Sequence, residues 1–342
     1  MRVIGLDIGG ANLKAADADG DCMSIPFAIW ESPDELPNRL RDILRLFPAA
    51  DCIAVTMTAE LADCFTTKTE GVNAVLDAVE SVAGGVAVVV WQTGAEFVDV
   101  ATARTVPFLV AAANWHALAS WAGRMVPTGE AVLLDVGSTT TDLIPLREGV
   151  PVPRGLTDIE RLRSGELLYT GVRRTPICAI APSLLVEGRP VAPAAELFAT
   201  SLDVYLLLGK IAEKRDDCET ANARPATLAE AHVRLARSVC CDCDELDRAT
   251  AIDLAQQVAA QQRRQITAHL ERILSDSVPR CAQVVVSGSG SFLADEVLEN
   301  CPRAQVLGCH ILASILSDAQ AQSAAALAVA RLAQERCLLE GI

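Results

Sequence analysis

Two segments of the chain place an aspartate at the end of an apolar run and a glycine two positions later. In MRVIGLDIGG the aspartate is Asp7, and in VLLDVGS it is Asp135. A turn of this kind exposes consecutive backbone N–H groups that bind phosphate oxygens. A carboxylate that closes a buried strand is costly unless it is paired or coordinates an ion. One copy is also compatible with an ordinary hairpin, but two copies in register predict a phosphate site in which Asp7 and Asp135 hold Mg²⁺ directly or through its waters.

The residues after the two aspartates are expected to complete the phosphate site, because they offer backbone N–H groups, hydroxyls and one ammonium group. Aligning Asp7 with Asp135 places Lys14 on Asp142, so the chain repeats a pattern. A third glycine-rich turn follows a strand-like run, and an ordinary strand-to-helix turn is its alternative interpretation. The predicted phosphate-binding residues are Gly9, Gly10, Asn12 and Lys14, then Gly137, Ser138, Thr139 and Thr140, and in the third turn Gly288, Ser289 and Gly290.

One glutamate follows another strand-like run, at the position where ligands collect in open α/β sheets. Glu60 lies in TMTAEL, after a continuous apolar run that begins at Cys52. Because ligands bind at the carboxyl ends of the strands, Glu60 is a candidate general base. The alternative is a carboxylate at a helix start, where it interacts with the helix dipole. The sequence leaves both interpretations open.

Alternating strand and helix patterns must position these residues. Short β-branched runs alternate with segments of helical spacing, which favours an α/β fold with parallel or mixed sheets. We expect helices over residues 108–124, 194–213 and 246–274. A chain of 342 residues is long enough for two lobes of roughly 150 residues each. A substrate cleft between the lobes is therefore available.

Composition narrows the class of partner. The 29 Lys and Arg residues against 44 Asp and Glu residues give a formal charge of −15, which opposes binding to nucleic acid or to anionic lipid. Apolar runs are far shorter than the roughly 20 residues that cross a bilayer, so we expect no membrane span. The first residues form a strand pattern and lack the features of a secretory signal, which predicts a cytoplasmic protein. The oligomeric state stays open, and a homodimer is one of the options.

Twelve cysteines are scattered along the chain, and in a reducing compartment we interpret most of them as small apolar residues. Cys240, Cys241 and Cys243 lie near His232 and Cys218 and raise the alternative of a zinc site. Their spacing does not match two C-x₂-C knuckles, and adjacent cysteines do not easily share one tetrahedral site. The role of this cluster stays open.

Several motifs resemble those of known families. VIGLDIGGANLKAA and VLLDVGSTTTDLIPL resemble the two phosphate loops of the sugar kinase, Hsp70 and actin superfamily, and the turn at 284–291 is similar to its adenosine-side loop. This resemblance implies two ribonuclease H-like lobes with a cleft between them. We predict an N-terminal lobe of residues 1–127, joined by the C-terminal helix 318–342, and a C-terminal lobe of residues 128–317 with a helical insertion at about 194–274.

A second resemblance is closer. TMTAELAD from Thr56, DVGSTTTD from Asp135 and GELLYTGVRRTP from Gly165 are similar to hydantoinase A/oxoprolinase-related proteins linked to tetrahydromethanopterin-dependent C1 transfer. The resemblance implies a transferase that joins an aminomethyl-furan-methyl diphosphate to the phenol of a glutamyl-tyramine and releases diphosphate, in methanofuran-type cofactor biosynthesis. Its small-molecule substrate would carry the diphosphate that the two loops bind.

In this chemistry, Mg²⁺ and the N–H groups of the loops stabilise the departing diphosphate. Glu60 is the first candidate to accept the phenol proton and Glu166 the second. The alternatives are an ATP-dependent kinase, an ATPase or a hydantoinase-like hydrolase in the same cleft, and a non-catalytic scaffold. The first loop reads Gly10-Ala11-Asn12, whereas kinases of the superfamily commonly carry Thr after the glycine pair, which counts against ATP as a cofactor.

Overall fold

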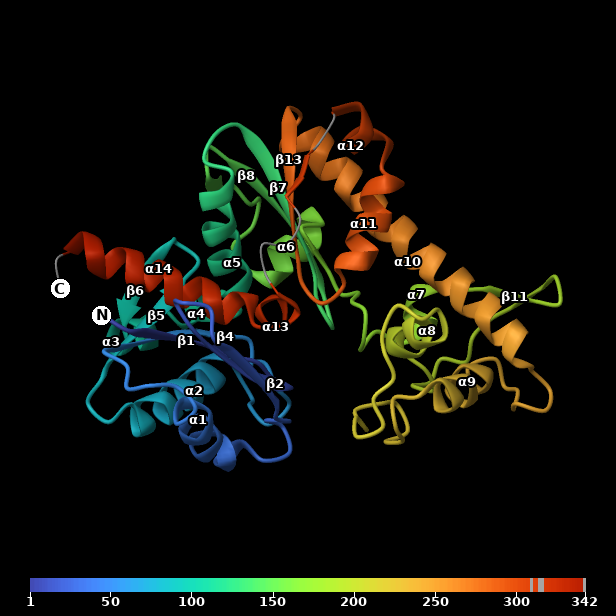
Figure 1. The fold of residues 1–342 in the computed structure, drawn as a ribbon, viewed down its shortest axis with the longest axis horizontal. Helices are drawn as coiled ribbons and strands as arrows, with labels where there is room; N and C mark the ends of the chain where they lie inside the picture. The colour runs from blue at the N-terminus through green and yellow to red at the C-terminus, as the bar shows by residue number, and fades with distance from the viewer. Residues whose placement is uncertain (308–309, 313–316, 341–342) are drawn as a thin grey trace.

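The computed structural model describes residues 1–307, 310–312 and 317–340. Its strands form two mixed sheets and one separate hairpin (Figure 1). The first sheet has the order β3-β2-β1-β4-β5-β6, with β1 Val3–Ile8, β2 Asn12–Asp17, β3 Cys22–Pro26, β4 Cys52–Met57, β5 Ala87–Gln92 and β6 Glu96–Asp99.

The second sheet has the order β10-β8-β7-β13-β14, and β9 pairs with β8. Its strands are β7 Glu130–Val136, β8 Thr141–Arg147, β9 Val150–Pro151, β10 Leu167–Leu168, β13 Cys281–Ser287 and β14 His310–Leu312. The separate hairpin joins β11 Leu184–Val186 to β12 Arg189–Val191.

The two sheets are built alike around their central strands. β1 is antiparallel to β2 and parallel to β4, and β7 is antiparallel to β8 and parallel to β13. The two predicted aspartates occupy equivalent ladder positions. The ladder partners are Lys14 and Thr56 for Asp7, and Asp142 and Ser287 for Asp135. The α/β class and the repeated strand-turn pattern expected from the sequence are confirmed.

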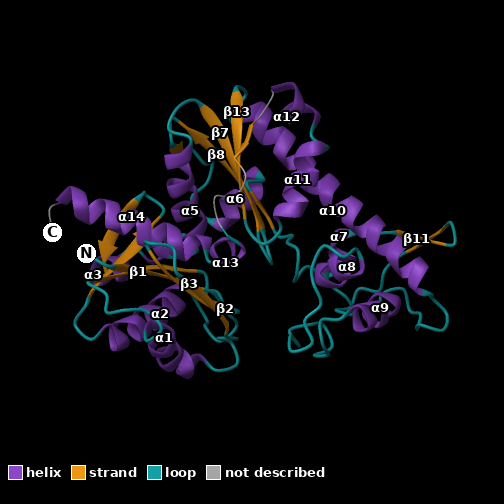
Figure 2. Ribbon diagram, viewed as in Figure 1, coloured by secondary structure: helices purple, strands orange, loops and turns teal. Residues whose placement is uncertain are grey.

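Helices cover both faces of each sheet. In Figure 2, α14 and α5 lie on one side of the first sheet and α1 and α2 on the other, while α5 and α10–α11 flank the second. The helices are α1 Leu36–Leu44, α2 Lys68–Ala83, α3 Val100–Thr105, α4 Pro107–Val110, α5 Asn114–Ala122, α6 Asp158–Ser164, α7 Ile177–Ile180, α8 Ser201–Leu207, α9 Leu228–Arg237, α10 Arg248–Asp276, α11 Ser291–Glu299, α12 Pro302–Leu307, α13 Asp318–Gln322 and α14 Ala324–Glu340, with 3₁₀ turns η1 Pro33–Glu35 and η2 Gly123–Met125.

The C-terminal helix α14 packs on β1, β2 and β4 of the first sheet (Figure 1). Gly5 in β1 permits this close approach, because an added Cβ would lie 2.8 Å from the backbone nitrogen of Ala330. The lobe division stays a prediction, and its residues 308–309, 313–316 and 341–342 lie outside the described part of the chain.

Two of the expected helices are wrong in extent. The helix expected over 108–124 is interrupted between α4 and α5 by Ala112, whose φ of 48° is left-handed. The helix expected over 194–213 is only α8, because Thr200 begins it with a capping box and Gly209 follows its end with a φ of 67°. The helix expected over 246–274 is α10, which begins at Arg248 and ends at Asp276.

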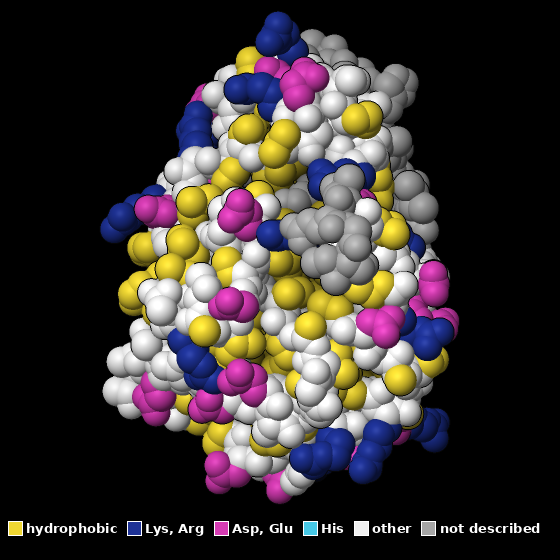
Figure 3. All heavy atoms as spheres, turned by 90° about the vertical axis from the view of Figure 1, so that its left-hand side faces the viewer, with side chains coloured by type: hydrophobic (Ala, Val, Ile, Leu, Met, Phe, Trp, Pro, Cys, Tyr) yellow, Lys and Arg dark blue, Asp and Glu magenta, His cyan; other side chains and the backbone are white. Residues whose placement is uncertain are grey.

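One face of the molecule carries side chains of both charges. On the face in Figure 3, acidic and basic side chains are interspersed around exposed apolar ones. Within the described residues, no helix is both long enough and apolar enough to span a bilayer.

Candidate active site

The two predicted phosphate loops are tight turns of the same construction. In the first, the Gly9 N–H donates to the Asn12 carbonyl at 3.0 Å, and in the second the Gly137 N–H donates to the Thr140 carbonyl at 2.8 Å. This shared geometry follows from the shared sequence pattern, in which a glycine stands two residues after the aspartate.

The carbonyl groups of both loops are held by neighbouring backbone segments. In the first loop, the Ile29 and Phe27 N–H groups donate to the carbonyls of Gly10 and Ala11. In the second, the segment 172–174 does the same: Val172 donates to the Gly137 carbonyl, and the next two residues donate to the Ser138 carbonyl at 3.0 Å. The carbonyls therefore point away from the exposed side of each turn.

The N–H groups of the same loops stay available. In the described structure, no protein acceptor is found for the N–H groups of Gly10, Ala11, Ser138, Thr139 and Thr140. These residues are partly exposed, so water or a ligand can reach them. Loops that have their carbonyls tied back and their N–H groups free form an anion-binding surface.

Asp7 is almost completely buried, with an exposed fraction of 1%. Lys14 donates a charge-assisted hydrogen bond to Asp7 Oδ2 at 3.2 Å across the β1–β2 ladder. The other carboxylate oxygen, Oδ1, is buried without a partner in the described residues, and so is Oγ1 of its neighbour Thr56. Buried oxygens without donors are costly, and a hard cation that takes oxygen ligands would satisfy both. The residues at this position therefore fit Mg²⁺.

Asp135 occupies the equivalent position in the second sheet and is partly exposed. Burial among its neighbours raises the pKa of its carboxyl from 3.8 to about 7, and the negative charge of Asp142 adds to this rise. The Ser287 hydroxyl and the Lys14 ammonium lower this pKa, while Asp7 raises it. Because Asp7 and Lys14 act on Asp135 from the other sheet, the two loops lie close enough to interact.

The third glycine-rich turn packs against the second loop. Gly288 has a φ of 91°, a left-handed conformation that favours glycine, and an added Cβ would meet the Val136 carbonyl and lie 2.8 Å from Asp135 Oδ1. The Gly290 N–H donates to the Val136 carbonyl at 2.8 Å. Ser289 lies between them, directly before α11. The turn therefore shapes the surroundings of Asp135.

Glu60 follows β4 and is 2% exposed. Desolvation raises the pKa of its carboxyl from 4.5 to about 7, against the smaller lowering effects of backbone hydrogen bonds and of Lys68. Its Oε2 has no hydrogen-bond partner among the residues that the structure describes. Asp158 in α6, beside the second sheet, also raises the pKa of Glu60. Glu60 is therefore a buried carboxyl group that can titrate near neutral pH, within electrostatic reach of α6.

Glu166 is fully buried in a different setting. Both of its carboxylate oxygens accept from the Arg154 N–H, at 2.8 and 3.1 Å. Its carbonyl accepts from the Leu143 N–H. These bonds hold the loop before α6 onto β8, and they give Glu166 a structural role.

The sequence pattern did not indicate the buried ion pair behind the second loop. Arg161 in α6 donates to Asp142, and its guanidinium carbon lies 3.9 Å from the ring centre of Trp115. Asp158 lies 3.7 Å from the same guanidinium. The helix reads DIERLRS, like any surface helix, so only the tertiary structure shows that Arg161 is 1% exposed. Arg161 therefore balances the negative charge of Asp142, which is the ladder partner of Asp135.

A buried hydrogen-bond network connects the helical segments to the second loop. The Gln262 side chain donates at 2.8 Å to the Thr170 hydroxyl and to the Gly171 carbonyl, and accepts from the Tyr205 hydroxyl at 2.7 Å. The residues after Gly171 hold the carbonyls of the second loop. Helices α8 and α10 therefore help to fix that loop through Gln262.

Replacing Gln262 by leucine is expected to lower the free energy of unfolding by roughly 2–4 kcal/mol, because buried hydrogen-bonding groups lose their partner. Urea unfolding followed by circular dichroism measures this loss. Gln261→Leu on the same helix is the control, because Gln261 bonds only to the exposed Arg264 among the described contacts. Equal stability of the two variants would contradict a role for the network.

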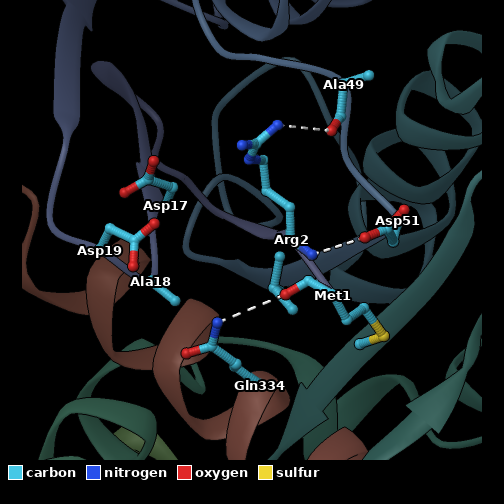
Figure 4. Close-up of a pocket in the computed structure, with 9 residues that line it drawn as sticks. Met1, Arg2, Asp17, Ala18, Asp19, Ala49, Asp51 and Gln334 are labelled. Atoms are coloured by element: carbon cyan, nitrogen blue, oxygen red, sulfur yellow. Dashed lines mark hydrogen bonds between the residues drawn. The ribbon is translucent and has the colours of Figure 1, made fainter.

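Other candidate positions lie away from the loops. Within the described ranges, no group of three or more His, Cys, Asp or Glu side chains could hold a metal ion by itself, and Cys240, Cys241 and Cys243 are free thiols after α9. A pocket of about 370 Å³ lies at the other end of β1 and β4 from the loops, beside Arg2, Asp51 and Gln334 (Figure 4). It contains none of the predicted site residues.

Comparison with known proteins identifies the family. The hydantoinase/oxoprolinase family model matches residues 51–336. The chain belongs to the hydantoinase/oxoprolinase family. It is 32% identical over 302 residues to the (4-{4-[2-(gamma-L-glutamylamino)ethyl]phenoxymethyl}furan-2-yl)methanamine synthase of Methanocaldococcus jannaschii, and the match covers 87% of this chain and 89% of that enzyme. The similarity to hydantoinase/oxoprolinase proteins expected from the motifs is confirmed.

Solved structures confirm the fold of this hydantoinase/oxoprolinase family member. A Listeria monocytogenes protein described as an N-acetylmannosamine kinase by inference aligns with a TM-score of 0.51 at 13% identity, over 98% of this chain and all of that chain. Nucleotide-free acetone carboxylase aligns with a TM-score of 0.55 at 10% identity, over 96% of this chain and 70% of that chain. The sugar kinase, Hsp70 and actin type of fold predicted from the loops is confirmed.

Proposed function

We propose that the protein is a transferase that joins an aminomethyl-furan-methyl diphosphate to the phenol oxygen of a glutamyl-tyramine and releases diphosphate. The relative that shares 32% identity is a synthase whose name describes a phenoxymethyl-furan product. Such an ether forms when a phenol oxygen replaces a leaving group on the furan methylene. The single observation that carries the proposal is the pair of matched loops, with free N–H groups beside Asp7 and Asp135.

The free N–H groups of the two loops bind the diphosphate oxygens and orient the substrate. Asp7 and Asp135 would hold Mg²⁺, with Thr56 close to Asp7. When bound, Mg²⁺ neutralises the charge that develops on the leaving diphosphate. The fixed N–H dipoles act in the same direction, because they are already oriented toward the anion before the bond breaks.

The reaction breaks the bond between the furan methylene and the diphosphate oxygen, and the electron pair leaves with diphosphate. The electron-rich furan stabilises the positive charge on the methylene carbon, which the phenol oxygen then attacks. Glu60 accepts the phenol proton. Its pKa of about 7 suits a general base at neutral pH.

ATP is not required by this reaction, because the leaving group comes with the substrate. The loops would also accept the phosphates of a nucleotide, so a kinase or ATPase activity is the alternative outcome of the test. The experiment incubates the protein and Mg²⁺ with the furan diphosphate and glutamyl-tyramine, and detects the ether by mass spectrometry.

The matched control is an acceptor in which the phenol oxygen is methylated. The proposal expects the ether with the free phenol, without ATP, and no ether with the methylated acceptor. A product that forms only with ATP would favour the kinase alternative. The absence of any product from the purified, folded protein would contradict the transferase.

A further inference from the structure

An arginine and a tryptophan from the two halves of the chain meet beside the phosphate loops. The guanidinium carbon of Arg174 lies 5.5 Å from the ring centre of Trp30. This distance is within the range of a cation–π interaction. Both side chains are exposed, Trp30 to 38%, so the contact lies at the surface.

Each partner is attached to one of the loops. The backbone N–H of Ile29, the residue before Trp30, donates to the Gly10 carbonyl at 3.0 Å. The backbone N–H of Arg174 itself donates to the Ser138 carbonyl at 3.0 Å. The contact between the two side chains therefore bridges the first and second loops, next to their free N–H groups.

Arg173 is held in an ion pair, whereas Arg174 has no carboxylate partner among the described residues. Arg173 donates to both carboxylate oxygens of Asp217 at 2.7 Å. For Arg174, the described residues contain no carboxylate partner, and Trp30 is its recorded side-chain contact. In a chain with a formal charge of −15, an arginine without a carboxylate partner beside an anion-binding loop is free to bind a ligand anion.

The other charged groups at the loops are paired or acidic. Lys14 is paired with Asp7, and Arg161 is paired with Asp142. Asp135 adds a further acidic group, so these five groups together supply no net positive charge. A diphosphate bound there needs cationic partners besides Mg²⁺, and a guanidinium binds two phosphate oxygens at once.

We propose that the guanidinium of Arg174 binds the diphosphate group of the substrate and leaves Trp30 when it does so. The inference rests on the proposed function in taking diphosphate as the ligand. Arg174 is then a substrate-binding residue for the donor, and Trp30 holds it in the ligand-free protein. The alternative ligand of Arg174 is a carboxylate of the glutamyl acceptor. The experiments below distinguish the diphosphate from the carboxylate.

Tryptophan fluorescence reports the contact directly. Trp30 is 38% exposed, whereas Trp91, Trp115 and Trp121 are 4%, 4% and 6% exposed. Inorganic diphosphate is titrated into the protein with Mg²⁺, and binding is measured in parallel by calorimetry. We expect a saturable change in emission that Trp30→Phe abolishes while it leaves the affinity within about threefold, because a cation–π contact at an exposed site is weak.

Arg174→Gln is expected to weaken diphosphate binding roughly ten- to a hundredfold, because hydrogen bonds to a charged group are lost. The variant should also lose the emission change. Arg189→Gln is the matched control, since Arg189 is an exposed arginine in the separate β11–β12 hairpin, and it should bind like the unchanged protein. Wild-type affinity in Arg174→Gln, or unchanged Trp30 emission at saturation, would overturn the proposal.

Steady-state kinetics distinguish this inference from the proposed function. The inference expects Arg174→Gln to raise KM for the furan diphosphate and to leave KM for the glutamyl acceptor unchanged. A rise in KM for the acceptor alone would assign Arg174 to the carboxylate and contradict the proposal. Diphosphate binding through Arg174 by a protein that forms no ether would leave the inference standing and sink the proposed reaction.

Discussion

Replacing Asp135 by asparagine is expected to lower kcat/KM by roughly a thousandfold, equivalent to about 4 kcal/mol of transition-state stabilisation. Asparagine keeps the shape of the side chain but removes the carboxylate that would hold Mg²⁺ beside the leaving diphosphate. Asp7→Asn should have an effect of similar size, because its unpartnered Oδ1 lies in the equivalent position of the first sheet. Turnover at saturating Mg²⁺ measures both losses.

The fold should survive both substitutions. Asp135→Asn removes one acidic group beside Asp142 and so relieves the repulsion between the two carboxylates. Asp7→Asn loses only the ion pair between Asp7 and Lys14. Asp51→Asn is the control, because Asp51 lies just before β4, at the other end of that strand from the site (Figure 4), and accepts from the Arg2 N–H. Near-normal turnover in both Asp7→Asn and Asp135→Asn would contradict the Mg²⁺ site.

Replacing Glu60 by glutamine is expected to lower kcat roughly a hundred- to a thousandfold, because a general base contributes about that much. In the unchanged protein, the rate should rise with pH through about 7, where the Glu60 carboxyl loses its proton. Asp135 also has a raised pKa of about 7, so the rates are measured at saturating Mg²⁺, which would keep Asp135 ionised. Under this condition the variant should lack the rise. Initial rates between pH 5.5 and 8.5, a range of about three units chosen to bracket that pKa, measure the two profiles.

The same substitution should stabilise the protein at alkaline pH. The pKa of Glu60 is about 7 in the folded protein against an ordinary 4.5, so the folded state keeps a proton that the unfolded state loses. Stability therefore falls as pH rises from 4.5 to about 7, by at most about 3 kcal/mol. Glutamine carries no such cost, so Glu60→Gln should unfold at a higher temperature than the unchanged protein at pH 8.

Glu166→Gln separates the two candidate bases. Because Glu166 binds the Arg154 N–H with both oxygens, this variant should lose stability and keep the pH profile of the unchanged protein. A pH profile that persists in Glu60→Gln and disappears in Glu166→Gln would reverse the two roles.

The loops could be predicted from the sequence because their signal is local. An apolar strand, an aspartate and a glycine two residues later are contiguous, and the pattern occurs twice. The structure shows two turns with matching hydrogen bonds at Gly9 and Gly137. The helix boundaries failed where single residues decide them, as at Ala112 with its left-handed backbone. Helical periodicity does not report such a residue.

The contacts that complete the site could not be predicted, because they join distant residues. Arg161 reads as a surface residue of α6 until the structure shows it buried between Asp142 and Trp115. Trp30 and Arg174 stand 144 positions apart, by their numbering, and neither belongs to a pattern that would pair them. The sequence shows that such residues could bind a partner, but only the fold shows which residues meet.

The most direct test of the proposed reaction is the stoichiometry of diphosphate release. The protein, Mg²⁺, the furan diphosphate and glutamyl-tyramine are mixed without nucleotide, and diphosphate is followed by phosphorus NMR while the ether is quantified by mass spectrometry. The account predicts one diphosphate for each ether formed, and neither product with Asp135→Asn. Diphosphate release without ether, or ether formation that depends on added ATP, would contradict it.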